Sequence, residues 1–243
     1  MAIVGKMGMF MMMMLVVGIT IVVADPDALQ DVCVADFNSN TLIKITIFNN
    51  LFNTRYNTLL QTNSAVKVNG FVCKAAFNAT DFFSDVLAKP GLTNNTNGAV
   101  VTLANVMKIP GLNTLGVSLA RIDYAPGGIN PPHTHPRATE IVYVLEGELY
   151  VGFITTANVL VSTTIKQGEV FVFPKGLVHF QINNGYVPAA VIAGFNSQLQ
   201  GTVTIATTLF GATPPVPDNV LEKGFQIDTA DVVKIKAKFA PKP

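Results

Sequence analysis

The middle of the chain carries short runs of β-branched, aromatic and aliphatic residues separated by polar, turn-forming segments. Glycine or proline lies between most neighbouring runs, and these residues commonly interrupt regular structure and form turns. Many short strands with turn signals between them are typical of an all-β sandwich or barrel. The pattern predicts strands in five stretches: 117–124, 141–153, 170–173, 191–195 and 203–207.

The C-terminal tail follows a helical pattern. Asp218 and Asp228 are of a residue type that often caps helix N-termini, so they predict two short helices. In the second, Val232, Ile235 and Phe239 are spaced at i, i+3 and i+7 and form one apolar stripe. A short amphipathic helix must bury such a stripe either on its own barrel or on a neighbouring chain.

Residues 1–24 form a strongly apolar stretch with Lys6 near its start. Its small C-terminal residues suit signal-peptidase cleavage before Asp25, so we expect a signal peptide and a secreted chain without a membrane anchor. A membrane anchor is the alternative, because the apolar part approaches the roughly 20 residues of a spanning helix. The lack of a basic cluster after residue 24 favours the signal peptide. No internal repeat divides 25–243, which we interpret as a single domain.

Charge gives little indication of a nucleic-acid partner. Without residues 1–24, which hold one Lys and no acidic residue, the chain has 15 basic and 15 acidic residues. A neutral chain without a basic run offers no electrostatic footprint for nucleic acid. Its two cysteines, Cys33 and Cys73, indicate one disulfide if the chain is secreted, with two buried free thiols as the alternative.

All three histidines of the chain fall in two short segments. On a strand, successive side chains alternate faces, so His133 and His135 would point the same way and could share an ion. Glu140 follows closely and can add an oxygen ligand, and His179 lies after a turn at Pro174–Gly176. Four such ligands would leave two open positions on an octahedral ion. A lone histidine is more often structural, but use of all three in this order favours a metal site.

The two segments resemble the two boxes of the cupin family, Gly-x5-His-x-His-x4-Glu-x6-Gly and Gly-x5-Pro-x-Gly-x2-His-x3-Asn. Every position of both boxes is filled, by Gly127, His133, His135, Glu140 and Gly147, and by Gly168, Pro174, Gly176, His179 and Asn183. Further stretches around Cys33, Cys73, 131–140, 195–198 and 208–211 are similar to the germin branch.

The resemblance covers nearly all of the mature chain and implies a germin-like protein. It implies a cupin jelly-roll β-barrel with short C-terminal helices that holds manganese through His133, His135, Glu140 and His179. It also implies a homo-oligomer, a hexamer built as a trimer of dimers, located in the apoplast or cell wall. Chemistry alone would allow zinc, iron, manganese, nickel or copper at such a site, so Mn(2+) rests mainly on the resemblance.

Two departures from the germin pattern bear on these expectations. About 20 residues at 41–61 have no counterpart in the usual germin-like pattern and represent either a gene-model artefact or a real insertion. Oxalate-oxidising germins carry asparagine at two pocket positions; Asn130 fills one here, but Ala120 occupies the other. Loss of that amide donor should weaken the binding of a dianion, which disfavours oxalate oxidase.

Three functions are compatible with the sequence. A manganese superoxide dismutase is favoured, oxalate oxidase is the alternative enzyme, and a non-catalytic cell-wall or storage-type cupin is the alternative of another class. Asn130 is the pocket candidate beside the ligands, and the small-molecule substrate is left open. Two sequons, at Asn78 and Asn94, are candidate glycosylation sites of a secreted chain.

Overall fold

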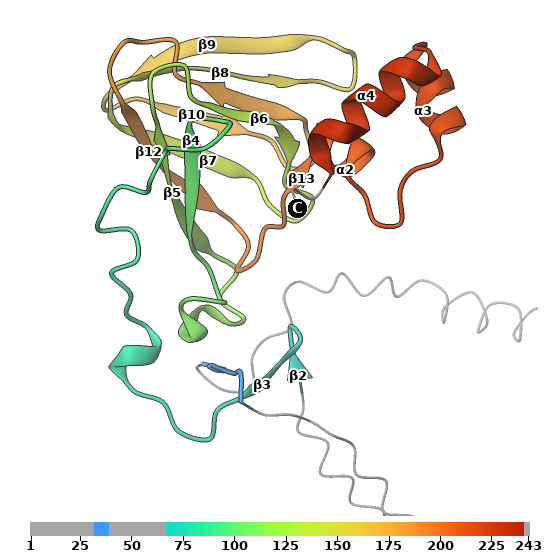
Figure 1. The fold of residues 1–243 in the computed structure, drawn as a ribbon. Coiled ribbons are helices and arrows are strands. Elements are labelled where there is room, and N and C mark those ends of the chain that lie inside the picture. The colour runs from blue at the N-terminus through green and yellow to red at the C-terminus, as the bar shows by residue number, and fades with distance from the viewer. Residues whose placement is uncertain (1–31, 39–66, 241–243) are drawn as a thin grey trace, which may run out of the picture. The chain divides into compact units, whose positions relative to one another are not determined.

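The computed structural model describes residues 32–38 and 67–240. The strands of this part of the chain form three antiparallel sheets, one small and two with five strands each (Figure 1). The small sheet has the order β1-β3-β2, formed by Ala35–Asp36, Phe71–Cys73 and Lys67–Val68. The signal peptide expected at 1–24 and the insertion expected at 41–61 lie outside the described residues.

The first large sheet has the order β10-β7-β12-β5-β4. Its strands are β4 (Ala99–Ala104), β5 (Ser118–Tyr124), β7 (Glu140–Glu146), β10 (Val170–Phe173) and β12 (Ala189–Phe195). The second has the order β13-β6-β11-β8-β9. Its strands are β6 (Ile129–Thr134), β8 (Glu148–Ile154), β9 (Leu160–Lys166), β11 (His179–Ile182) and β13 (Val203–Thr204). Two 3-10 turns precede β5, η1 (Ala79–Asp81) and η2 (Pro110–Leu112).

One hydrophobic core lies between the two large sheets. Inward-facing residues from strands of both sheets belong to a single buried cluster. Burial of each aliphatic side chain contributes roughly 1.5–3 kcal/mol. The all-β class and the cupin jelly-roll barrel with short C-terminal helices are thereby confirmed. Members of the cluster include Ile122, Val142, Val144, Leu149, Val151, Ile165, Phe173 and Val191.

The long predicted run 141–153 is divided by a tight turn at Gly147. This residue has φ of +74°, and a Cβ there would approach the Pro188 carbonyl oxygen to 2.7 Å. Only glycine suits that combination of backbone conformation and close approach. The turn joins β7 of one large sheet to β8 of the other, so it helps to close the barrel.

Three helices follow the strands: α2 (Ile205–Phe210), α3 (Asp218–Phe225) and α4 (Thr229–Phe239). The strand predicted at 203–207 is wrong beyond Thr204, because tertiary packing overrides the β preference of its Ile and Thr residues. Asp228 caps α4, and its Oδ1 accepts from the Asp231 N–H at 2.8 Å. The other predicted cap is wrong: Pro217 is the N-cap of α3, and Asp218 lies in its first turn.

The apolar stripe of α4 is partly buried within the chain. Val232 is 0% exposed, while Ile235 and Phe239 are half-buried. Lys236 ties α4 to the start of α3 through the Asp218 carboxylate, with an Nζ–Oδ1 distance of 2.5 Å. Within the chain, α4 packs against α2 and α3. Among the described residues, no helix is long and apolar enough to cross a membrane.

Cys33 and Cys73 form a disulfide, as the sequence indicates. It links the segment before β1 to the end of β3, so it closes the small sheet on one side. The Asn113 amide nitrogen donates to the Cys33 sulfur at 3.3 Å. Both Cys33 and Asn113 are buried. The disulfide therefore lies in a packed part of the structure rather than at its surface.

Candidate metal centre

The strand pairing brings the three histidines and Glu140 into one end of the barrel. His133 lies near the end of β6 and is paired with His179, the first residue of β11. His135 follows β6 directly. Glu140 is the first residue of β7, where it pairs with Phe195 and Phe173 of the neighbouring strands. The four side chains thus come from both large sheets.

The four side chains present one ligand atom each within 4.8 Å of one another. The Glu140 Oε2 atom lies 2.9 Å from the His135 Nε2 and 3.1 Å from the His179 Nε2. All four residues are at most 5% exposed. This is the cluster that the order of residues in the two sequence boxes predicts.

Each imidazole is oriented by a backbone carbonyl on its outer side. The Nδ1 atoms of His133 and His179 lie 2.8 Å from the carbonyl oxygens of Pro131 and Leu177. The His135 Nδ1 lies 2.5 Å from the Gly201 carbonyl oxygen. A carbonyl only accepts, so each Nδ1 carries the proton and donates. In a neutral ring the Nε2 then has a free lone pair, which is the form that binds a metal.

With this tautomer, the contacts of Glu140 with His135 and His179 indicate whether a cation belongs between them. A neutral imidazole that donates through Nδ1 has no proton left on Nε2, so His135 and His179 each turn a lone pair toward an anionic carboxylate. Two acceptors at about 3 Å repel unless a positive charge lies between them. A proton or a metal ion can supply that charge. The geometry therefore calls for a cation at the centre of the cluster.

The spacing also fits a metal ion. With metal–ligand bonds of about 2.1 Å, two neighbouring ligands on a six-coordinate ion are about 3.0 Å apart. The separations of 2.9 and 3.1 Å around the Glu140 oxygen match adjacent positions of this kind. Four donors within 4.8 Å of one another can thus bind one ion together. His133, His135, Glu140 and His179 fit a single divalent metal.

Electrostatics keep the donors in their metal-binding forms. Burial, and secondarily the neighbouring His179, lowers the pKa of His133 from 6.5 to about 4. Burial raises the pKa of Glu140, but hydrogen bonds from His135 and His179, which need a proton on Nε2 when no metal is bound, outweigh that effect and lower it from 4.5 to about 2. At neutral pH the site therefore offers a neutral His133 and an ionised carboxylate.

Aromatic rings pack against two imidazoles of the cluster. Phe173 stacks on His179 with ring centroids 4.5 Å apart and an interplanar angle of 20°. Phe195 meets His135 edge to face at 5.0 Å. These contacts fix the planes of two imidazoles, and Phe173 excludes water from the core side.

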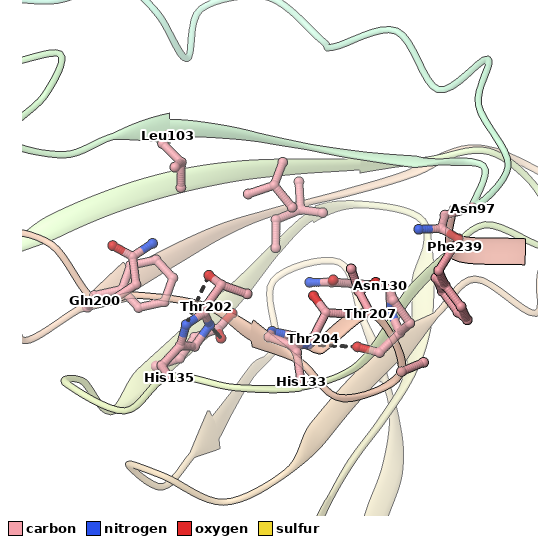
Figure 2. A pocket seen from close by; sticks show the side chains of 16 residues that line it. Asn97, Leu103, Asn130, His133, His135, Gln200, Thr202, Thr204, Thr207 and Phe239 are labelled. Atoms are coloured by element: carbon pink, nitrogen blue, oxygen red, sulfur yellow. Dashed lines mark hydrogen bonds and ion pairs between the residues drawn. The ribbon is translucent and has the colours of Figure 1, made fainter. Parts of the chain in front are cut away.

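On the other side the cluster opens into a cavity of about 430 Å³ (Figure 2). Three of the four cluster residues line it, and His179 is not among the lining residues. Asn130, the predicted pocket residue, lines it as well. The remaining lining residues are neutral: Asn97, Val101, Leu103, Ile122, Pro131, Phe195, Gln200, Thr202, Thr204, Ala206, Thr207 and Phe239. Helices α2 and α4 thus contribute to the lining of the cavity.

Ala120 lies in the barrel core. It is 0% exposed and is paired across β4 and β5 with Leu103, which lines the cavity. Paired residues on adjacent strands point to the same face. The side chain at position 120 therefore points into the barrel beside the cavity, and alanine offers no hydrogen-bond donor there.

Sequence reasoning missed a buried polar chain behind Glu140. The Gln181 amide nitrogen lies 3.4 Å from the Glu140 Oε1, and the Tyr124 hydroxyl donates to the Gln181 Oε1 at 3.3 Å. Gln181 is two residues beyond His179 on β11, so strand alternation could have placed it on the same face. The other missed contacts come from the loop at 199–202, which has no periodic pattern.

The comparisons with known proteins agree with this site and fold. A family model described as Cupin matches residues 86–232, which is more than half of the chain. The chain therefore belongs to the cupin family.

Relatives with high sequence identity to the chain show which branch of the cupin family it belongs to. The chain is 64% identical over 218 residues to a rhicadhesin receptor of Pisum sativum, with 89% of each chain covered. It is 62% identical over 221 residues to germin-like protein subfamily 2 member 1 of Arabidopsis thaliana, with 90% of each covered. A solved structure of a recombinant oxalate oxidase in complex with glycolate is 43% identical, with a TM-score of 0.74, covering 89% of this chain and 98% of that one. Within the cupins, the chain is a germin-like protein.

Proposed function

We propose that His133, His135, Glu140 and His179 hold one manganese(II) ion and that the protein catalyses superoxide dismutation at this site. The observation that carries the proposal is the buried set of three carbonyl-anchored imidazoles and one carboxylate, which requires a cation at its centre. A donor set without thiolate is compatible with manganese, and the resemblance to germins favours it. When bound, manganese supplies one-electron redox chemistry and two open coordination positions.

The charge of the site favours a monoanion as the substrate. Three neutral imidazoles and one carboxylate leave a divalent site with a net charge of about +1. The superoxide anion would neutralise that charge, whereas a dianion such as oxalate would leave a buried negative charge. No Lys or Arg is among the described residues that line the cavity, so nothing there would offset it.

The protein's own residues would hold the metal, orient the imidazoles and shield the site from water. The carbonyls of Pro131, Leu177 and Gly201 hold the imidazoles in one tautomer. Phe173 excludes water from the core side, and Phe195 fixes the plane of the His135 ring. The cavity, lined in part by residues of α2 and α4, has room for small molecules. Dismutation converts two superoxide ions and two protons into one molecule of oxygen and one of hydrogen peroxide, and solvent in the cavity supplies the protons.

Oxalate oxidation is the second candidate. The 43% identity to an oxalate oxidase over most of both chains favours it. The alanine at position 120 and the neutral cavity walls count against it. A cell-wall or storage-type cupin whose metal has only a structural role is the candidate that needs no turnover.

We further propose secretion to the apoplast or cell wall, after cleavage of residues 1–24, and assembly into a homo-oligomer, a hexamer by resemblance. Apolar residues on the outer faces support self-association. Among them are Ile141 and Tyr143 on β7, each 47% exposed, and Val220 and Val233 on the tail helices, each 54% exposed. Light scattering that gives the mass of a single chain would contradict the assembly.

We also propose glycosylation at Asn78 and Asn94. Both side chains are exposed, as a glycan requires. The Asn78 Oδ1 accepts from the Thr80 N–H at 2.9 Å and caps η1. Its Nδ2 atom, which would carry the glycan, makes no hydrogen bond to the described residues. A glycan on Nδ2 therefore leaves the cap in place.

The test combines metal analysis with two assays on the same secreted, dialysed sample. We expect about one manganese per chain and superoxide dismutation above that of free Mn²⁺ at equal concentration, with little hydrogen peroxide from oxalate. The His135→Ala variant should lose metal and activity together. Activity equal to free Mn²⁺ would reject the dismutase, and peroxide formation from oxalate would favour the second candidate.

A further inference from the structure

The loop between β12 and β13 places an unpaired carboxamide in the cavity. Gln200 lines the cavity and is only 3% exposed. Its Oε1 atom is buried and accepts no hydrogen bond from any described residue. A buried acceptor without a partner is destabilising, and such atoms in a folded protein call for an explanation.

The backbone of this loop is held in place. The Gln200 carbonyl accepts from the Arg137 N–H at 3.2 Å, and the Leu199 carbonyl accepts from the Arg137 Nε at 2.7 Å. The next carbonyl, that of Gly201, anchors His135. The side chain of Gln200 therefore starts from a fixed point next to a metal-ligand residue.

The carboxamide has the chemistry to recognise a hydroxyl group. Its oxygen accepts and its nitrogen donates, and a half-turn about the last side-chain bond exchanges the two ends. Figure 2 shows Gln200 on the side of the cavity near His135 and Thr202, away from Asn97 and Phe239. A molecule bound at the cluster would thus have this carboxamide on one side and no cationic side chain among the described lining residues.

We propose that Gln200 is a recognition subsite for the hydroxyl group of a small monoanionic molecule, such as a short hydroxycarboxylate. The carboxylate would be anchored at the cluster, and the hydroxyl would donate to the Gln200 oxygen once the carboxamide has turned toward it. This inference rests on the proposed metal site, because only a bound cation would anchor the carboxylate in a cavity with neutral walls.

The test measures binding rather than turnover. Calorimetry on the full-length, manganese-loaded protein compares glycolate with acetate, and 3-hydroxypropionate with propionate. Each pair differs by a single hydroxyl, so the ratio of the two affinities reports the hydroxyl contact. We expect the hydroxyl to improve the better-fitting pair about 2- to 10-fold, the range of one neutral hydrogen bond.

The Gln200→Leu variant should bring that ratio close to one while the affinities for acetate and propionate stay unchanged. Gln167→Leu is the matched control, because Gln167 is exposed in the turn between β9 and β10. Gln200→Asn keeps a carboxamide but withdraws it by one carbon, so it should shift the preference toward 3-hydroxypropionate.

Metal content separates failure of this inference from failure of the proposed function. If the wild-type protein retains metal but shows no hydroxyl preference, or if Gln200→Leu preserves the preference, the subsite is refuted and a water molecule satisfies the carboxamide. If the protein retains no metal, the proposed function fails. The subsite then fails with it, because no cation anchors the carboxylate.

Discussion

Replacement of Glu140 by glutamine tests the cluster most directly. The change keeps the shape of the side chain and removes the only carboxylate of the cluster. Residues that merely support a metal ligand typically contribute 10- to 100-fold to affinity. A carboxylate that contacts two of the other ligand residues at 2.9 and 3.1 Å should contribute at least the upper value. We therefore expect Glu140→Gln to weaken manganese binding by about 100-fold or more.

The effect on stability follows from linkage. At a free manganese concentration about 100 times the dissociation constant, binding stabilises the wild-type protein by about 2.7 kcal/mol. At the same concentration a variant with a 100-fold weaker site gains only about 0.4 kcal/mol. For a domain of this size, 1 kcal/mol shifts the melting temperature by roughly 2–4 °C. The variant should thus lose about 5–9 °C of the manganese-dependent shift.

The assay is thermal unfolding of stripped protein, with and without added manganese, together with metal analysis after dialysis. Glu146→Gln is the matched control, because Glu146 is exposed at the other end of the same strand. It should keep the full shift. An unchanged manganese-dependent shift in Glu140→Gln would refute the assignment of Glu140 as a ligand.

Three further outcomes are expected. Replacing Cys33 and Cys73 by serine should cost about 4 kcal/mol of unfolding free energy in the chain-entropy model, for a sequence separation of 40; equal denaturation midpoints of variant and wild type would contradict this. Metal-free protein should lose up to about 3 kcal/mol as pH falls from 6.5 to about 4, because the pKa of His133 is lowered by burial and the unfolded chain takes up its proton first. A flat stability profile over that range would contradict it. The Asn78→Gln variant of the secreted protein should lose the mass of one N-glycan; an unchanged mass by mass spectrometry would exclude that site.

The candidate ligands could be predicted because their signal is local. Strand alternation places His133 and His135 on one face, and the spacing within the two boxes includes Glu140 and His179. Glycine or proline separates most of the predicted runs, so the barrel class also follows from the sequence, although the turn at Gly147 inside 141–153 was not predicted. These features depend on neighbouring residues, and no long-range information is needed to recognise them.

Other features depend on tertiary context and could not be predicted in the same way. Residues 205–207 have a strand-like composition, yet they begin α2 because the chain packs there against β6 and α4. Asp218 is of a residue type that often caps helices, but its carboxylate pairs with Lys236, which is 18 residues away. The contact of the 199–202 loop with His135 joins positions 66 residues apart, without any periodic pattern.

The anchoring of all three imidazoles by backbone carbonyls has a consequence for how the site tolerates mutation. Every residue has a carbonyl, so replacing the side chain of Leu177 leaves its hydrogen bond to His179 available. Only substitutions that move the backbone would disturb these hydrogen bonds between carbonyls and imidazoles. Gly201 is such a position, since its φ is +68° and a Cβ would approach the Arg137 guanidinium to 2.7 Å. The site can therefore stay intact while much of the sequence around it diverges, and its weak point is a glycine outside both boxes.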